Sequence, residues 1–143
     1  MKEIYTGNFD DIGAAKLATL SLINAGCDFI FHQANEAGGG VFQACSERNV
    51  RCFGSNKNQN DLAPDVIVAS AVLDVPSAFL YMARIVRDHQ FQPHVYWLGR
   101  KEGIVSVVWN ERLKPTISPT LAEVARLEKE IRGGAFTVPR GKF

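Results

Sequence analysis

The sequence predicts an α/β fold, a single doubly wound and mostly parallel sheet with helices on both faces. Short apolar, β-branched runs alternate with segments of helical periodicity along the chain, which is the pattern of parallel strands joined by crossover helices. No internal repeat, low-complexity stretch or linker interrupts this alternation. We therefore expect residues 1–143 to form one domain, a single α/β lobe, with residues 134–143 as a loose tail.

The predicted strands are short runs of the buried parallel type. They cover residues 3–6, 27–32, 50–54, 66–72, 94–98 and 104–109. The run at 66–72 is the richest in β-branched residues and is the strongest strand prediction.

The predicted helices are defined by apolar spacing and by their end signals. The first covers residues 11–25, with Gly26 as its stop, and the second ends near residue 48. The third follows Asp74, with Pro76 in its first turn, and carries an apolar stripe of Phe79, Met82, Ala83 and Val86. The last begins with Ser118 as the expected N-cap, or one step later with a capping box of Thr120 and Glu123. It buries Leu121, Val124, Leu127 and Ile131, and stops at Gly133-Gly134.

Composition excludes several classes of protein. Hydrophobic residues make up 46% and charged residues 22%, with a net charge of +1, so nothing attracts nucleic acid or an anionic membrane. No apolar run approaches the ~20 residues of a membrane span, and the amino terminus has no apolar signal core. Three cysteines cannot form a complete disulfide framework, and none lies at metal-ligand spacing from a histidine, so we expect no metal and no cofactor.

Polar residues gather at four predicted strand-to-helix turns, and ligands of open α/β sheets bind at such turns. The first turn, Gly7-Asn8-Phe9-Asp10-Asp11, offers a ring for stacking and oxygen acceptors for a planar polar ligand. The alternative is that Phe9 belongs to the core and that Asp10 or Asp11 only caps the helix. The candidate ligand contacts on the four turns are Asn8, Phe9, Asp10, Asn35, Glu36, Gly38, Asn56, Asn58, Ser70 and Leu73.

Six segments, in order and spacing, resemble the basic membrane protein family, the solute-binding proteins of ABC transporters related to purine nucleoside receptors. They are Gly-Asn-Phe-Asp-Asp, Ala-Gly-Cys-Asp-Phe-Ile-Phe, Gly-Gly-Val-Phe-Gln-Ala, Leu-Ala-Pro-Asp, Ala-Ser-Ala-Val and Gly-Arg-Lys-Glu-Gly-Ile-Val. The resemblance covers about residues 5–139. It implies a type I periplasmic-binding-protein fold, in which two lobes close on a ligand, and this chain matches the carboxyl-terminal lobe.

The resemblance also implies roles for single residues. Phe9 matches the aromatic ring that stacks on the purine, and Asn35 and Glu36 stand where the family usually has glycines that approach the base. Asn56 stands where nucleoside receptors have an aspartate for the ribose hydroxyls. Asn58 and Gln59 occupy the next Asp-Gln positions, and Leu73 the position of a lysine near the sugar. Relative to the nucleoside receptors, these departures remove two charged groups and add one, so the hydrogen bonds to a nucleoside would differ in strength.

The preferred hypothesis is a non-catalytic binding lobe for a purine nucleoside or similar small polar molecule. Its implied partners are that ligand, a missing amino-terminal lobe or a second copy of the chain, and an ABC transporter permease, but no nucleic acid. The alternative is a stand-alone cytosolic single-lobe metabolite sensor acting as a homodimer. The parent family is extracytoplasmic and membrane-anchored, whereas this chain, if complete, would be cytoplasmic. A small flavodoxin-like enzyme ranks last because no nucleophile accompanies the histidines, of which His32 lies nearest the turns and is expected to be structural.

Overall fold

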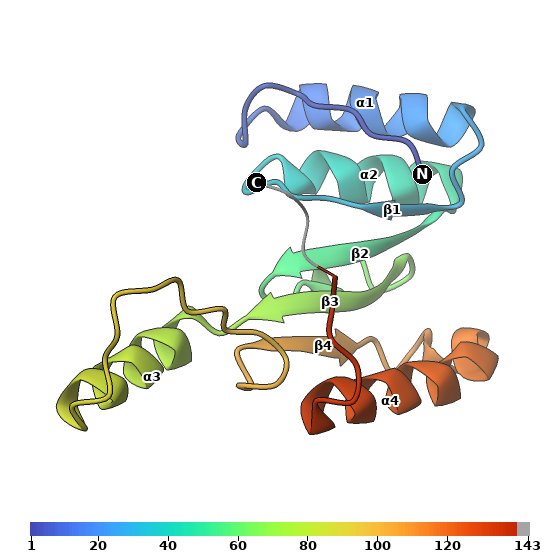
Figure 1. Ribbon diagram of the computed structural model, residues 1–143. Coiled ribbons are helices and arrows are strands. Elements are labelled where there is room, and N and C mark those ends of the chain that lie inside the picture. The colour runs from blue at the N-terminus through green and yellow to red at the C-terminus, as the bar shows by residue number, and fades with distance from the viewer. Residues whose placement is uncertain (140–143) are drawn as a thin grey trace. The chain divides into compact units, whose positions relative to one another are not determined.

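A computed structural model describes residues 1–139 and confirms the predicted α/β class. Its elements are, in chain order, α1 (Ile12–Asn24), β1 (Phe29–Phe31), α2 (Gly38–Arg48), β2 (Arg51–Asn56), β3 (Ile67–Leu73), α3 (Val75–Arg87), β4 (Val105–Trp109) and α4 (Ser118–Gly133) (Figure 1). Short 3-10 turns lie at Asn60–Leu62 and Lys114–Ile117. Residues 140–143 of the expected tail lie outside the described part of the chain.

The strands form one mixed sheet in the order β1-β2-β3-β4. The first three are parallel, with Ile30 opposite Cys52 and Gly54 opposite Ser70, and the pairing of β2 with β3 is irregular between Cys52 and Phe53. The fourth strand runs in the opposite direction to β3 (Figure 1). The carboxyl ends of β1, β2 and β3 therefore meet at one edge of the sheet, where the predicted turns lie.

Two predicted strands are wrong. Residues 3–6 and 94–98 are irregular and belong to none of the strands of the described chain. Tyr5 is 88% exposed, and the rings of His94 and Tyr96 stack on each other with centroids 4.1 Å apart. Apolar composition supplies a strand-like pattern, but a strand also needs a neighbouring backbone to pair with.

The helix ends follow the predicted signals with one correction. Asp11 caps α1 by accepting a hydrogen bond from Ala14 N–H, and Asp74 caps α3 in the same way. Gly134 ends α4 with φ 76°, a left-handed conformation that glycine adopts without strain. Both predicted caps of α4 are wrong, because Ser118 and Thr120 are already helical and Ile117 occupies the cap position without a side-chain hydrogen bond.

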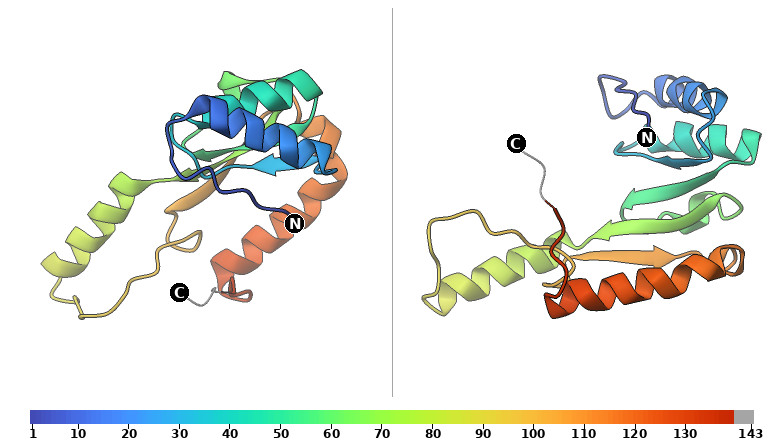
Figure 2. Two further views of the ribbon diagram at one scale, coloured as in Figure 1. Left: turned by 90° about the horizontal axis from the view of Figure 1, so that it is seen from above. Right: turned by 45° about the vertical axis from the view of Figure 1, so that its right-hand side comes forward.

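The chain divides into two compact units. The first contains Met1–Val72 and Val107–Thr116. Within it α1 and α2 pack along each other (Figure 2). Their inward side chains form one apolar core with those of the strands, and this core includes Ala15, Ile30, Val41, Cys45, Cys52 and Ile67.

Gly40 lets the two helices of the first unit approach closely. A Cβ atom at this position would lie 2.0 Å from the backbone oxygen of Ile12 and 2.9 Å from the backbone nitrogen of Lys16. Real side chains do not tolerate such distances, so any residue other than glycine would push the helices apart. A Cβ atom at the neighbouring Gly39 would meet no described atom within 4 Å.

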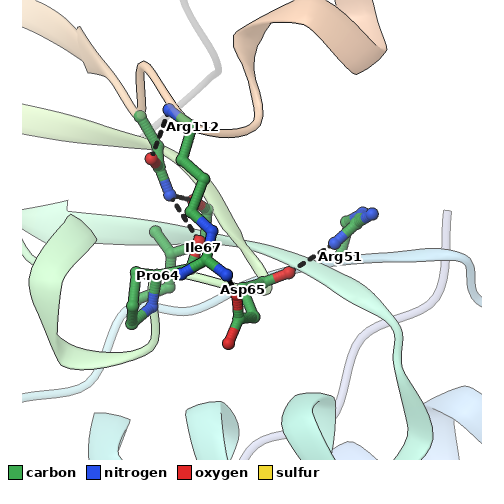
Figure 3. Close-up of polar contacts among 6 residues, drawn as sticks. Arg51, Pro64, Asp65, Ile67 and Arg112 are labelled. Carbon is green, nitrogen blue, oxygen red and sulfur yellow. Dashed lines mark hydrogen bonds and ion pairs between the residues drawn. The ribbon is translucent and has the colours of Figure 1, made fainter.

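A buried asparagine joins the segment after β4 to the beginning of β3. Asn110 is buried, and its Nδ2 donates to the backbone oxygens of Pro64, at 2.8 Å, and Ile67, at 2.7 Å (Figure 3). Arg112 forms an ion pair with Asp65, at 2.7 Å, in the same cluster (Figure 3). The amide thus donates to one carbonyl of the segment before β3 and to the carbonyl of the first residue of β3, as buried polar groups require.

The second unit contains Leu73–Ser106 and the described residues from Ile117 onward. Arg100 joins α4 through an ion pair with Glu128, at 2.7 Å. Neither α3 nor α4 contains a buried residue. The four apolar residues predicted to face the core on α4 are half-buried, but the predicted core stripe of α3 is wrong, since Phe79 is 74% exposed and Val86 is also exposed.

Candidate functional site

The first turn is built around the Asn8 side chain. Its Oδ1 accepts hydrogen bonds from the backbone N–H groups of Asp10, at 3.1 Å, and Asp11, at 2.8 Å, which closes the turn before α1. Asp11 then caps the helix, as one interpretation of this stretch predicted. Phe9 is 64% exposed, so the interpretation that its ring belongs to the core is wrong. The ring is instead available to a ligand.

The second turn is tied directly to the first. The backbone N–H of Ala37 donates to the backbone oxygen of Phe9, at 2.9 Å. Asn35 and Glu36 precede Ala37 in this turn, and Gly38 begins α2. The two turns predicted to lie at one edge of the sheet are thus in contact, and the position of Phe9 depends on the conformation of residues 33–37.

The third turn follows β2. Asn56, the last residue of the strand, has φ 67°, which asparagine tolerates better than most residues. Asn58 Oδ1 accepts from the backbone N–H of Asn60, at 3.1 Å, and so begins the short 3-10 turn. Asn58 therefore shapes the loop, while Asn56 is exposed at its start.

Ser70 lies inside β3, not in a turn, because the strand continues to Leu73. It is fully buried, and its hydroxyl accepts from Gln59 N–H, at 3.0 Å, and donates to Asn60 Oδ1, at 2.8 Å. Gln59 Oε1 in turn accepts from Ser55 N–H, at 2.7 Å. Ser70 is thus committed to holding the loop after β2 and supports the site from beneath.

A polar pocket of about 260 Å³ lies between the second and third turns, and we call it the rim pocket. It includes three of the predicted contacts, Asn35, Glu36 and Asn56, together with Ser55, Lys57 and Gln59. Phe42 and Leu62 supply apolar wall. Amide, carboxylate and ammonium groups give the pocket both donors and acceptors, which suits a neutral ligand with polar groups of both kinds.

A second pocket, which we call the first-turn pocket, lies beside Phe9 and has a volume of about 410 Å³. Asn8, Phe9, His32 and Gln33 line it together with mostly apolar side chains of α1, β1 and residues 4–7. Ala34 lines both pockets. An apolar cavity with a few polar groups has the composition of small-molecule sites.

His32 is the functional candidate that the sequence indicated least clearly. It is 6% exposed, its Nδ1 accepts from Ala34 N–H at 3.3 Å, and its ring contacts the edge of Phe42 at a centroid distance of 5.1 Å. Its Nε2 is buried without a hydrogen-bond partner among residues 1–139. Burial lowers the pKa of His32 below its ordinary value, and contacts with the Gln59 side chain and the Ala34 backbone oppose this shift in part. His32 was expected to be a structural residue with both ring nitrogens hydrogen-bonded, but in the described part of the chain only Nδ1 has a partner.

The structure does not bring every candidate together. Asp10 is exposed and contributes only its backbone N–H to the first turn. Leu73 ends β3 and belongs to the second unit, where it is exposed. Ser55 and Lys57 line the rim pocket and flank Asn56, but they were not among the predicted contacts. Their position at the end of a buried strand could have indicated them as ligand contacts.

Residues 1–139 contain neither a cluster of metal-binding side chains nor a membrane-spanning helix. No group of three or more metal-binding side chains forms in this part of the chain. No helix among these residues is long and apolar enough to cross a bilayer. Cys45 and Cys52 are buried free thiols in the core of the first unit, and Cys27 is a half-buried free thiol.

A family model described as ABC transporter substrate-binding protein PnrA-like matches residues 2–142. The chain belongs to this family. Basic membrane protein D of Borreliella burgdorferi is 30% identical over 145 residues, and basic membrane protein A2 of Borrelia garinii is 28% identical over 142 residues. A purine-binding protein of Brucella abortus is 25% identical over 107 residues. The match covers 96% of this chain but 42% of either basic membrane protein, so the chain spans less than half the length of these relatives.

Solved structures share the fold of this PnrA-like chain. An ABC transporter solute-binding protein from Aeropyrum pernix K1 matches with a TM-score of 0.70 at 20% identity, over 96% of this chain and 48% of that chain. A transcriptional activator of the comK gene from Bacillus halodurans matches with a TM-score of 0.72 at 17% identity, over 95% of this chain and 47% of that chain. Two predictions from the sequence are thus confirmed: the resemblance to the ABC transporter substrate-binding family and the α/β fold.

Proposed function

We propose that this PnrA-like chain is the ligand-binding carboxyl-terminal lobe of a solute-binding protein, that its ligand is a purine nucleoside or similar small polar molecule, and that it performs no catalysis. The observation that carries the proposal is the hydrogen bond from Ala37 N–H to the backbone oxygen of Phe9, which ties the residue with the exposed ring to the turn that forms the rim pocket. The Phe9 ring lines the first-turn pocket, and Ala34 lines both that pocket and the rim pocket with its amide and charged groups. The purine-binding relative supports the choice of ligand.

In this proposal the candidate residues divide into contacts and supports. Phe9 stacks on the base, while Asn35, Glu36 and Asn56 supply polar contacts from the rim pocket. Asn8, Asp10, Gly38, Asn58 and Ser70 shape the turns. Leu73 occupies the sequence position of the family's lysine and supplies no charged group. One open rim leaves the ligand largely exposed to water, so we expect binding by this chain alone to be weak, in the millimolar range or undetectable.

The proposal extends to partners. Substrate-binding proteins of this family serve ABC transporters, and we propose that a permease and a second, amino-terminal lobe complete the function of this chain. Covering one ligand from two sides would bury more of it than an open rim can.

The test is amide chemical-shift mapping during titration of the chain with adenosine, guanosine and inosine, because chemical shifts report binding as weak as millimolar. We expect shifts at Phe9, Asn35, Glu36 and Asn56, and their loss in a Phe9→Ala variant. Phe91→Ala is the matched control because Phe91 is also exposed but belongs to the second unit. Shifts that survive in Phe9→Ala, or that lie outside the two pockets, would refute this assignment.

A further inference from the structure

We infer that His32 is a positioning residue of the ligand site and that the neutral imidazole is the binding-competent form. The inference rests on the proposed function for the identity of the ligand site. The control of residues 33–37 by His32 does not depend on which ligand binds there. The sequence favoured an ordinary structural role for this histidine. Three observations on its surroundings assign it a more specific one.

The first observation is the hydrogen bond from Ala34 N–H to His32 Nδ1, at 3.3 Å. A nitrogen that accepts a hydrogen bond carries no proton, so the proton of the neutral ring resides on Nε2. Protonation would convert Nδ1 into a donor that faces another donor. The contact would then break, and residue 34 would lose the group that fixes its backbone.

The second observation is the tight packing of the ring. A Cβ atom at Gly38 would lie 2.7 Å from His32 Cε1, so the imidazole fits directly beneath the first residue of α2. The edge of Phe42 closes another side, and Nε2 is buried without a partner in the described part of the chain. Burial among such groups makes the imidazolium costly in this position.

The third observation connects His32 to the proposed ligand contacts. Residues 33–37 hold Phe9 through the Ala37 N–H···O hydrogen bond, and they carry Asn35 and Glu36 into the rim pocket. A change at Ala34 therefore reaches the stacking ring and the polar wall together. His32 itself lines the first-turn pocket beside Phe9.

The charged groups near His32 do not change the preference of the buried ring for its neutral form. The second turn carries Glu36, and the loop after β2 carries Lys57, two residues before Gln59; both line the rim pocket. The first turn carries Asp10 and Asp11, and Asp11 is occupied as the cap of α1. In α2, Glu47 and Arg48 lie at the far end of the helix, and Glu47 pairs with Lys16 of α1. Burial is the largest cause of the shift in the pKa of His32 and favours the neutral form, and it outweighs the opposing contacts with the Gln59 side chain and the Ala34 backbone.

The pH dependence follows from linkage. Because the pKa of His32 in the folded chain lies below its ordinary value of 6.5, the unfolded chain takes up a proton first as the pH falls. This contribution to stability is complete above about pH 6.5 and is lost as the pH falls through the folded pKa. Ligand affinity should fall in the same window, by at most about tenfold per pH unit for a single proton.

The experiment is an NMR titration of the full chain from about pH 7.5 to about pH 5, a range that spans ordinary histidine titration. The His32 ring and the amides of Ala34 and Ala37 are followed, first without ligand and then with adenosine or guanosine. We expect the two amides to shift with the midpoint of His32, and nucleoside affinity to follow the same midpoint. In His32→Asn, whose Oδ1 can replace Nδ1 as acceptor, the amides should keep their high-pH positions at every pH. His89→Asn is the matched control, because His89 is exposed and has φ 54°, which asparagine tolerates.

The outcomes separate the two proposals. If Ala34 and Ala37 do not respond while His32 titrates, or if the response persists in His32→Asn, the positioning role is refuted. The wild-type titration decides this even if His32→Asn does not fold. If neither nucleoside binds at any pH but both amides follow His32, the choice of purine nucleosides fails, whereas the control of residues 33–37 by His32 is upheld.

Discussion

Replacing Gly40 with alanine tests the packing of α1 against α2 most directly. The added Cβ would lie 2.0 Å from Ile12 O, about 1.4 Å short of the 3.4 Å at which ordinary contact begins. Both atoms nearest to it belong to the backbone of α1, so no side-chain rotation relieves the clash. The helices must separate, and the core residues between them, such as Ala15 and Val41, lose contact.

The expected cost follows from two opposing effects. Overpacking a well-packed interior costs roughly 1–3 kcal/mol, and a rigid backbone places this case at about 3 kcal/mol. Alanine is favoured over glycine within a helix by roughly 0.5–1 kcal/mol, which offsets part of the loss. We therefore expect the free energy of unfolding of Gly40→Ala to fall by about 2 kcal/mol.

Urea denaturation followed by circular dichroism measures this difference. Gly39→Ala is the matched control, since Gly39 lies in the same helical turn and a Cβ there meets open space. The control should be neutral or stabilised by up to about 1 kcal/mol through the same helix preference. Equal stability of the two variants would refute the close approach of α1 and α2.

Three further perturbations follow from particular contacts. Asp11→Ala removes the cap of α1 and should lower the free energy of unfolding by about 1 kcal/mol, whereas Asp10→Ala should change it by less than half as much; equal effects would contradict the capping assignment. Asn110→Ala leaves the Pro64 and Ile67 carbonyls without their donor and should cost about 2–3 kcal/mol in urea denaturation, so a neutral result would argue against this buried link. Phe79→Ser should leave the free energy of unfolding within about 0.5 kcal/mol and reduce self-association in light scattering, because the ring is exposed; a large loss of stability would show that it is packed.

The site was predictable in part because it lies at the ends of parallel strands. Strand-to-helix turns rich in asparagine pointed to Asn35, Glu36 and Asn56, and the structure gathers these three residues in one pocket. Ser70 was counted among the turn contacts although it falls inside the predicted strand 66–72, and its hydroxyl is instead committed to the loop after β2. The unsatisfied Nε2 of His32 left no trace in the sequence, since burial and hydrogen-bond partners come from residues far along the chain.

Local sequence was enough to define the helices, most of the strands and the family, because apolar periodicity, caps and glycine stops are local properties. Asp11, Asp74 and Gly134 mark helix ends in the sequence and occupy those positions in the structure. Tertiary contacts were needed to show that residues 3–6 and 94–98 are not strands, that the missing side chain of Gly40 lets two helices meet, and that Ala37 holds Phe9. Each of these depends on which distant backbone lies opposite, and local pattern carries no information about that partner.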